Sequence, residues 1–243
     1  MSVSLPVALL AGGMGTRLGP LTEQVPKSLV DVNGEPFIAH QLRLVRRQGV
    51  TRVVICAGHF GEQISAHIGD GAHFGLDVTY SFDGQRLLGT AGALAQALPR
   101  LPDAFFVMYG DSYLLCDYAA VEAAFCTARK QGLMTVYRNE NKFDRSNVEF
   151  VRNTLIAYNK RNPSPRMRHI DYGLAVLTRE ALAEVPDSEP TDLESVYRAL
   201  LERGELAGYE VTQRFFEIGS FSGLQELRAH LATQQPSRSR TEP

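Results

Sequence analysis

The sequence has few cysteines, almost no net charge and no long apolar run. Its three cysteines, Cys56, Cys116 and Cys126, form no Cys-x-x-Cys pair and cannot all pair with one another. Cys56 lies inside an apolar stretch, so we expect buried free thiols, as is typical of a reducing compartment. The formal net charge of −2 over 243 residues excludes a global field that would attract nucleic acid or an anionic membrane. Any anion must therefore be held by a local site.

The first residues also lack the features of a signal peptide. They contain no basic segment, and the apolar run at residues 7–11 is too short to cross a bilayer. The six histidines form no His-x-His or His-x-x-x-His pair, so no zinc site is expected. These absences predict a cytoplasmic protein without nucleic-acid or membrane partners.

The first half of the chain alternates between two kinds of pattern. Strands are expected at 7–11, 52–58, 78–82 and 104–111, and helices at 37–48, around Ile64 and Ile68, and at 91–98. Alternation of strands and helices predicts an α/β fold with a Rossmann-like, mostly parallel sheet flanked by helices. The strands are nearly continuous apolar runs, which indicates that helices cover both faces.

The second half changes character. A helix that carries Tyr118 and Val121 is expected to end at Gly132, and short strand patterns follow at 133–138, 148–151, 154–158 and 173–177. Their close spacing predicts a smaller antiparallel or mixed lobe laid onto the first sheet. Further helices are expected near 193–204 and 224–231. We expect a single domain over residues 1–232, and a polar, disordered tail at 233–243.

Three glycines, Gly12, Gly13 and Gly15, follow the first expected strand. Glycine lets backbone N–H groups approach a ligand closely, and clustered N–H groups near a helix start bind anions. The phosphate of a nucleotide is the expected ligand, although a plain tight turn is the alternative. No lysine occupies the P-loop position, and Leu18 stands where a dinucleotide fingerprint requires its last glycine, with Gly19 one residue too late.

Two cations follow the glycines. Arg17 offers a planar fork suited to phosphate oxygens, and Lys27 offers a compact point charge. Pro26 stiffens the backbone just before Lys27. The glycine-rich backbone, the arginine and a lysine held on a stiff segment together favour a phosphate-binding site over a plain turn.

The stretch LAGGMGTRLGPLTEQVPKSLVDVNGEPFI, Leu9 to Ile38, closely resembles the signature of the nucleotidyltransferases that make nucleoside-diphosphate sugars. In that family the pattern is L-A-G-G-x-G-T-R-L-x-P-L-T, then P-K, then V-x-G-x-P. The resemblance implies a Rossmann-like core that joins a sugar 1-phosphate to an NTP and releases pyrophosphate. It also implies a nucleotide-binding half at about 1–116 and a sugar-binding half at about 117–232.

The resemblance carries over to a set of nucleotide-binding residues. The segment LLGTAGAL, Leu87 to Leu94, is similar to a family stretch that passes close to the nucleobase, although Thr90 could equally begin an ordinary helix as its N-cap. Both interpretations can hold together. The implied nucleotide-binding set is Leu10, Ala11, Gly12, Gly13, Gly15, Thr16, Arg17, Lys27, Gly89 and Thr90.

Two carboxylates are candidates for binding Mg²⁺. Asp111 closes the last apolar strand of the first half, where side chains point into the ligand crevice of parallel sheets. An alternative is that Asp111 only caps the next helix. Gly110 and Asp111 fill the family's G-D positions, and Glu217 stands where the family usually has the Asp of D-x-G. The resemblance therefore implies that both carboxylates bind the metal.

Three later segments resemble the sugar-side patterns of the family. They are SNVEF at 146–150, YNK at 158–160 and DYGLAVL at 171–177. Asn159 replaces a glutamate and Asp171 replaces an asparagine, and these departures affect the identity of the sugar. The implied sugar-phosphate-binding set is Tyr109, Asn147, Glu149, Asn159, Lys160, Asp171 and Gly173.

The expected chemistry needs cations more than a base, because the attacking sugar phosphate is already ionised. Arg17 would stabilise departing pyrophosphate, and Lys27 would hold the α-phosphate or sugar phosphate, with Asp111 as the third catalytic residue. Similarity to mannose- and heptose-1-phosphate guanylyltransferases makes GTP the first choice, with UTP, dTTP and CTP open. A non-catalytic sugar-nucleotide-binding paralogue and a nicotinamide-dependent reductase are alternatives of other classes. The sequence leaves a homodimer open, as enzymes of this size often pair, although it shows no exposed apolar stripe that would mark an interface.

Overall fold

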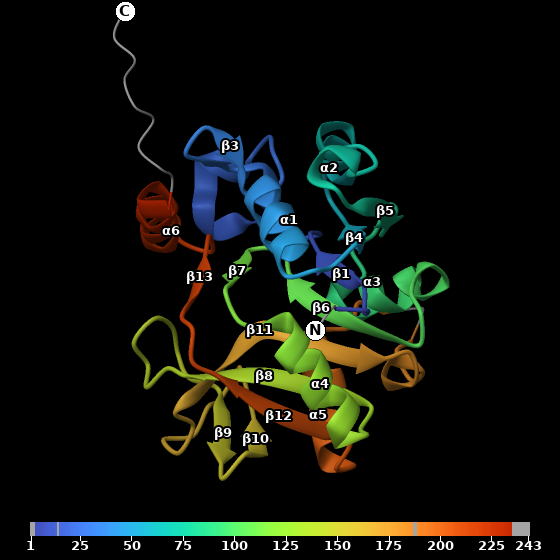
Figure 1. The fold of residues 1–243 in the computed structure, drawn as a ribbon, viewed down its shortest axis with the longest axis vertical. Coiled ribbons are helices and arrows are strands. Elements are labelled where there is room, and N and C mark those ends of the chain that lie inside the picture. Colours follow the sequence, from blue (N-terminus) through green and yellow to red (C-terminus); the bar gives the residue numbers. More distant parts are fainter. Residues whose placement is uncertain (1–2, 14, 187–188, 235–243) are drawn as a thin grey trace, which may run out of the picture.

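A computed structural model describes residues 3–13, 15–186 and 189–234, without the side chains of Thr16 and Arg17. Figure 1 shows a central sheet with helices on both sides. Four neighbouring strands are parallel, in the order β6, β1, β4, β5. Their bounds are β1 Val7–Leu10, β4 Arg52–Ala57, β5 Asp77–Phe82 and β6 Ala104–Tyr109. The mixed sheet with flanking helices confirms the predicted α/β class.

The second half of the chain continues the same sheet instead of lying on it. The long strand β11 pairs antiparallel with β6 on one side and with β8 on the other, and β12 then pairs with β8. A hairpin of β9 and β10 joins the start of β11. The bounds are β8 Gly132–Arg138, β9 Val148–Val151, β10 Thr154–Tyr158, β11 His169–Thr178 and β12 Leu206–Val211. One backbone ladder therefore links the two halves.

Alternation along β1 explains why helices cover both faces of the sheet. Val7 and Leu9 pack in a cluster with Ile38 of α1, whereas Ala8 packs in the opposite cluster with Leu94 of α3. The first cluster also takes side chains from α2 and α4, and the second takes side chains from α5. The helices are α1 Phe37–Arg47, α2 Gly61–Ile68, α3 Gly89–Ala97, α4 Tyr118–Ala128 and α5 Leu193–Glu202.

A third cluster anchors the glycine-rich segment. The last helix, α6 Phe221–Gln234, packs Leu224 and Leu227 against Leu18 and Val30, which lie between the glycines and α1. Short elements complete this region: β2 Asp31–Val32, β3 Glu35–Pro36, β7 Ser112–Leu114 and β13 Phe215–Glu217. Two short 3-10 helices, separated by a kink at Gly19, lie at Thr16–Thr22. Single helical turns lie at Lys27–Leu29, Ala72–Phe74, Leu98–Arg100 and Glu180–Leu182. The C-terminal helix thus braces the loop that carries Lys27.

Several predicted boundaries were wrong. The helix expected to end at Gly132 ends at Ala128, because Arg129 adopts a left-handed conformation (φ 51°) that stops it, and Gly132 already begins β8. The strand expected to reach Asp111 ends at Tyr109. The helix α6 runs to Gln234, so it includes the first two residues of the predicted tail, and residues 235–243 lie outside the described part. None of the helices described is long and apolar enough to span a membrane.

Candidate functional site

The carboxyl ends of β4, β1 and β6 meet at the edge where the glycine-rich loop leaves β1. The Ala11 N–H donates to the Cys56 carbonyl at 2.8 Å, and the Gly110 N–H donates to the Leu10 carbonyl at 3.0 Å. A Cβ on Gly110 would lie 2.4 Å from that Leu10 oxygen, so this backbone approach requires glycine. A cavity of about 380 Å³ opens at this edge. Ligand crevices of open α/β sheets lie at such strand ends.

Most of the predicted nucleotide-binding residues line this cavity. They are Leu10, Ala11, Gly12, Gly13, Gly15, Lys27, Gly89 and Thr90. The backbone of Thr16 and Arg17 begins the helical turn after Gly15, but their side chains lie outside what the structure describes. The role expected for Arg17 therefore stays a prediction.

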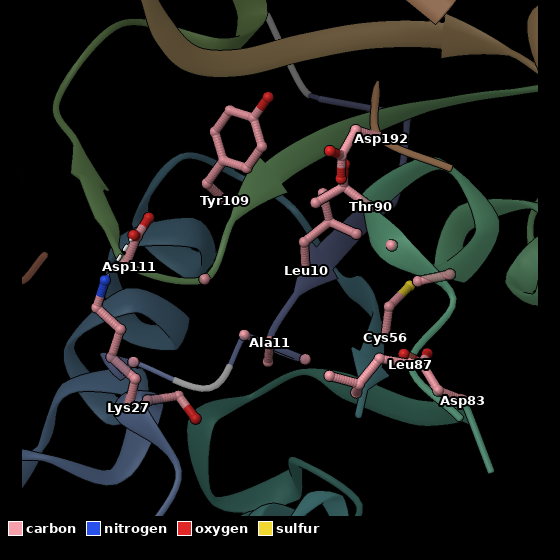
Figure 2. Close-up of a pocket in the computed structure, with 17 residues that line it drawn as sticks. Leu10, Ala11, Lys27, Cys56, Asp83, Leu87, Thr90, Tyr109, Asp111 and Asp192 are labelled. Carbon is pink, nitrogen blue, oxygen red and sulfur yellow. Dashed lines mark hydrogen bonds and ion pairs between the residues drawn. The ribbon is translucent and has the colours of Figure 1, made fainter. Parts of the chain in front are cut away.

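The two ends of the cavity differ in chemistry. Figure 2 shows Lys27 and Asp111 together at one end, and Cys56, Asp83 and Leu87 gathered at the other. The first end holds opposite charges, whereas the wall at Cys56 and Leu87 is apolar apart from the Asp83 carboxylate. A second carboxylate, Asp192, lies beside Thr90 on the same side of the pocket (Figure 2). A molecule with a charged tail and a flat, mostly apolar head fits this arrangement, as a nucleotide does.

Lys27 and Asp111 form an ion pair in which the Lys27 Nζ donates to Oδ2 of Asp111 at 2.7 Å. The Lys27 side chain is 12% exposed and that of Asp111 is 31% exposed. Gly15 takes a left-handed conformation (φ 66°), and a Cβ there would lie 3.1 Å from the Cβ of Lys27. The glycine loop therefore passes directly beside the lysine, so backbone N–H groups and a cation share one end of the cavity.

Gly89 and Thr90 connect this first cavity to the second half of the chain. The Thr90 hydroxyl accepts a hydrogen bond from the Leu193 N–H at 2.7 Å, at the start of α5, and caps no group of its own helix. The Ala91 N–H donates to the Thr191 carbonyl at 2.8 Å. The alternative that Thr90 is the N-cap of α3 is therefore wrong: Thr90 lies inside the first turn of α3, and its side chain caps α5 instead. These hydrogen bonds fix the position of the start of α3 relative to the start of α5.

Replacing Gly89 by alanine is expected to lower the free energy of unfolding by about 1–3 kcal/mol more than a matched change at Gly84. Both glycines have positive φ, 74° and 81°, so the backbone strain is similar. A Cβ on Gly89 would lie 2.6 Å from the Thr191 carbonyl oxygen, whereas Gly84 has nothing within 4 Å. Urea unfolding of both variants measures the difference. Equal losses would show that the Gly89–Thr191 contact does not matter.

The two predicted metal ligands lie side by side. β13 pairs antiparallel with β7 so that Glu217 faces Ser112, and the Ile218 N–H donates to the Asp111 carbonyl at 2.9 Å. Asp111 and Glu217 both line a second cavity of about 190 Å³. Among the described residues, no three His, Cys, Asp or Glu side chains gather as a metal site. Two carboxylates next to the glycine loop and Lys27 nevertheless fit Mg²⁺, which usually binds one or two carboxylates and completes its shell with water and phosphate oxygens.

The second cavity also collects predicted sugar-side residues. Tyr109, Asn147, Lys160, Asp171 and Gly173 line it, and Tyr109 and Asp111 line both cavities. The two cavities therefore share a wall at the carboxyl end of β6. A ligand in each would meet at Asp111.

Asp171 is the centre of a hydrogen-bonded group in this second cavity. Its side chain is 3% exposed, and its carboxylate accepts from the Tyr158 hydroxyl at 3.2 Å and the Gly173 N–H at 3.1 Å. The Lys160 Nζ lies 3.5 Å from this carboxylate and 3.1 Å from the Tyr109 oxygen, to which it donates. Burial, with Asp171 and Asp111 nearby, raises the pKa of Tyr109 well above its ordinary value. Tyr109 therefore stays a neutral phenol that can donate a hydrogen bond.

Two predicted sugar-side residues do not line this cavity. The Asn159 side chain accepts from the backbone N–H groups of Arg161 and Asn162 at 3.0 and 2.8 Å, so it closes a local turn. Glu149 lines a separate cavity, where its carboxylate lies 3.4 Å from Arg166. Their assignment to sugar binding gains no support from the geometry.

Sequence reasoning missed two acidic residues of the first cavity, Asp83 and Asp192. Asp83 directly follows β5, so the rule that singled out Asp111 at a strand end could have found it. Asp192 gives no such signal, because it comes to the pocket only through the contact of α5 with α3. The cysteine in the pocket wall is not reactive, since burial raises the pKa of Cys56 to about 12.

The chain resembles known proteins both in sequence and in fold. Residues 7–146 match the family described as Nucleotidyl transferase. The N-acetylmuramate alpha-1-phosphate uridylyltransferase of Neisseria meningitidis is 41% identical over 121 residues, which cover 49% of this chain and 51% of that protein. The mannose-1-phosphate guanylyltransferase catalytic subunit beta of Drosophila melanogaster is 27% identical over 219 residues, 87% of this chain and 58% of that protein. The chain thus spans little more than half the length of these relatives.

A solved structure agrees with the fold. HddC from Yersinia pseudotuberculosis, crystallised with GMP-PN, superposes with a TM-score of 0.78 over 94% of this chain and all of that chain, at 19% identity. At this identity the likeness extends to the fold alone.

Proposed function

The chain belongs to the nucleotidyl transferase family, and from this premise we propose that it joins an NTP to a sugar 1-phosphate, giving a nucleoside-diphosphate sugar and pyrophosphate. The observation that carries the proposal is the pair of cavities that share Tyr109 and Asp111. One has the glycine loop and Lys27 of a phosphate site, and the other has the polar wall around Lys160. Two phosphorylated ligands bound in them would present their phosphates to each other at Asp111.

The reaction forms one bond and breaks one. An oxygen of the sugar phosphate attacks the α-phosphorus, and the bond from that phosphorus to the β-phosphate oxygen breaks, so pyrophosphate leaves with the electron pair. The attacking oxygen is already ionised at neutral pH, and no general base is required. Positioning two anions against their repulsion is the main task of the protein.

The charged side chains divide this task between them. Lys27 would bind a phosphate oxygen at the shared wall, and Lys160, beside Tyr109, would bind the sugar phosphate. We propose Arg17 as the group that stabilises the leaving pyrophosphate. Asp111 and Glu217 would hold Mg²⁺, which when bound supplies positive charge to neighbouring phosphate oxygens. Lys27 must exchange its present partner, Asp111, for a phosphate when the substrates bind.

GTP and a sugar 1-phosphate of the mannose or heptose type are our first choice of substrates. The LGTAGAL segment and the likeness to the Drosophila guanylyltransferase over 87% of this chain support this choice. The higher identity to the Neisseria uridylyltransferase over a shorter stretch supports UTP as an alternative. We further propose that the protein is cytoplasmic, as its free thiols suggest; Cys56 and Cys116 are buried as expected, whereas Cys126 is exposed.

A matrix of assays tests the proposal. The purified chain is incubated with Mg²⁺, each of GTP, UTP, dTTP and CTP, and each of a panel of sugar 1-phosphates, and pyrophosphate release is followed. We expect release that requires both substrates and is fastest with GTP. Tight nucleotide binding with no release for any pair would instead indicate a non-catalytic binding protein.

A further inference from the structure

Asp83 places a carboxylate in the apolar wall of the nucleotide cavity, apart from the pocket's second carboxylate, Asp192, which lies beside Thr90 (Figure 2). Asp83 follows β5 and lies with Leu87 and Cys56, at the end of the pocket remote from Lys27 and Asp111 (Figure 2). Asp83 is not part of the glycine loop or of the two proposed metal ligands. Its position needs an explanation, because a carboxylate in an apolar wall is costly unless it finds hydrogen-bond donors.

The surroundings hold the Asp83 carboxylate in place but use only part of its capacity to accept hydrogen bonds. The Leu88 N–H donates to Oδ2 of Asp83 at 3.2 Å, and a Cβ on Gly12 would lie 3.7 Å from the same oxygen. Asp83 therefore lies directly beside Gly12, where the glycine loop leaves β1. Desolvation raises the pKa of Asp83, and the Leu88 hydrogen bond opposes this only in part. A ligand that brought further N–H donors would stabilise the ionised form.

The position of Asp83 matches the base end of a nucleotide. With the phosphates at Lys27 and the glycine loop, the ribose would lie along Leu10 and Ala11, which Figure 2 shows between the two ends. The base would then reach the wall formed by Leu87 and Ala93, with its polar edge near Asp83. The apolar side chains would cover the faces of the ring, and the carboxylate would meet its edge.

Only guanine among the common bases offers a carboxylate two adjacent donors. Its N1–H and its N2 amino group lie side by side, whereas uracil and thymine flank a single N3–H with two carbonyl oxygens that repel a carboxylate. Cytosine presents the acceptor N3 next to its amino group. On this basis we propose that Asp83 is a specificity-determining residue that accepts hydrogen bonds from guanine N1–H and N2–H and so selects GTP. The inference rests on the proposed function, because it presumes that a nucleotide occupies this cavity.

Equilibrium binding tests the inference without turnover. Titration calorimetry with Mg²⁺ and no sugar phosphate gives the Kd of GTP, ITP and UTP for the wild-type chain. ITP has the N1–H of guanine but lacks the N2 amino group, so its Kd should be higher than that of GTP by about 10- to 100-fold, the effect of one hydrogen bond to a charged group. UTP should bind at least as weakly as ITP.

A change at Asp83 should invert the preference. In Asp83→Asn the amide has one acceptor and one donor, which suits the N1–H and the O2 carbonyl of xanthine. We expect the variant to lose about 100-fold in GTP affinity and to bind XTP at least tenfold more tightly than the wild-type chain does. The matched control is Asp77→Asn, an exposed carboxylate at the other end of β5, which should leave all four affinities unchanged.

The outcomes separate this inference from the proposed function. Equal binding of GTP and ITP by the wild type, tighter binding of UTP, or no gain of XTP affinity in Asp83→Asn would overturn the role of Asp83. Each of these results would leave the proposed reaction standing, since pyrophosphate release is measured separately. Conversely, GTP selection by Asp83 with no pyrophosphate release from any substrate pair would support the inference and contradict the proposed reaction.

Discussion

Lys27→Ala is expected to lower kcat by a factor of about 10²–10³ while the fold is retained. The ammonium is held 2.7 Å from Asp111, and the side chain is only 12% exposed, so a cation stands preorganised at the wall that the two cavities share. Such a group stabilises charge that develops as one phosphate attacks another, and water cannot replace it equally well. Steady-state pyrophosphate release at saturating GTP and sugar 1-phosphate measures the loss.

Two further variants make the Lys27 result interpretable. Lys27→Met keeps the packing of the aliphatic stem and should lose as much activity as Lys27→Ala, because only the charge matters to the reaction. Lys130→Ala removes a lysine that follows α4 and lines neither cavity, so it should turn over normally. A melting temperature close to that of the wild type, together with nearly normal kcat in Lys27→Met, would remove Lys27 from the catalytic residues.

Asp111→Asn should also reduce kcat by at least about 10²-fold, and it should raise the Mg²⁺ concentration needed for half-maximal rate. Asparagine preserves the shape of the side chain but removes the charge that a divalent ion requires. The variant also leaves Lys27 without its carboxylate partner at 2.7 Å. Initial rates over a range of Mg²⁺ concentrations separate the two effects, since excess Mg²⁺ restores part of the rate only where metal affinity is the cause.

Asp103→Asn serves as the control for Asp111. Asp103 precedes β6 at the opposite end of the strand, and its side chain is fully exposed. It should leave kcat and the Mg²⁺ requirement unchanged. Binding of GTP in the absence of metal should survive in Asp111→Asn, because the glycine loop and the base end are intact. An unchanged Mg²⁺ requirement in Asp111→Asn would indicate that the metal binds elsewhere.

The elements of the fold were largely predictable because their signals are local. Apolar periodicity located the strands of the parallel sheet, and β1 differs from its predicted range by one residue. The arrangement of the second half was not predictable in the same way. Short strands such as β9 and β10 show where pairing can occur, but their partners depend on contacts between distant residues. The antiparallel pairing of β11 with β6, which merges the two halves, has no local signal.

The residues of the candidate site likewise fall into those that a local motif predicts and those that depend on distant contacts. The glycine loop, Lys27 and Asp111 were found because a short motif places them at the carboxyl ends of β1 and β6. Glu149 was misplaced for a physical reason. Alternation along β9 buries Val148 and Phe150 and turns Glu149 to the opposite face, but what it meets there, Arg166, depends on the path of a later loop. Asp192 reaches the first cavity only because α5 docks on α3.

By itself, the sequence determined the α/β class, the family and the place of the glycine loop and Lys27 at one end of the pocket, since these depend on periodicity and on residues that are close along the chain. Only the tertiary structure decided that Thr90 caps α5, that Tyr109 and Asp111 join two cavities, and that Asp83 lies beside Gly12. Each of these depends on which distant segments pack together. That choice is set by the burial of whole helix and sheet faces, which no short stretch of sequence contains.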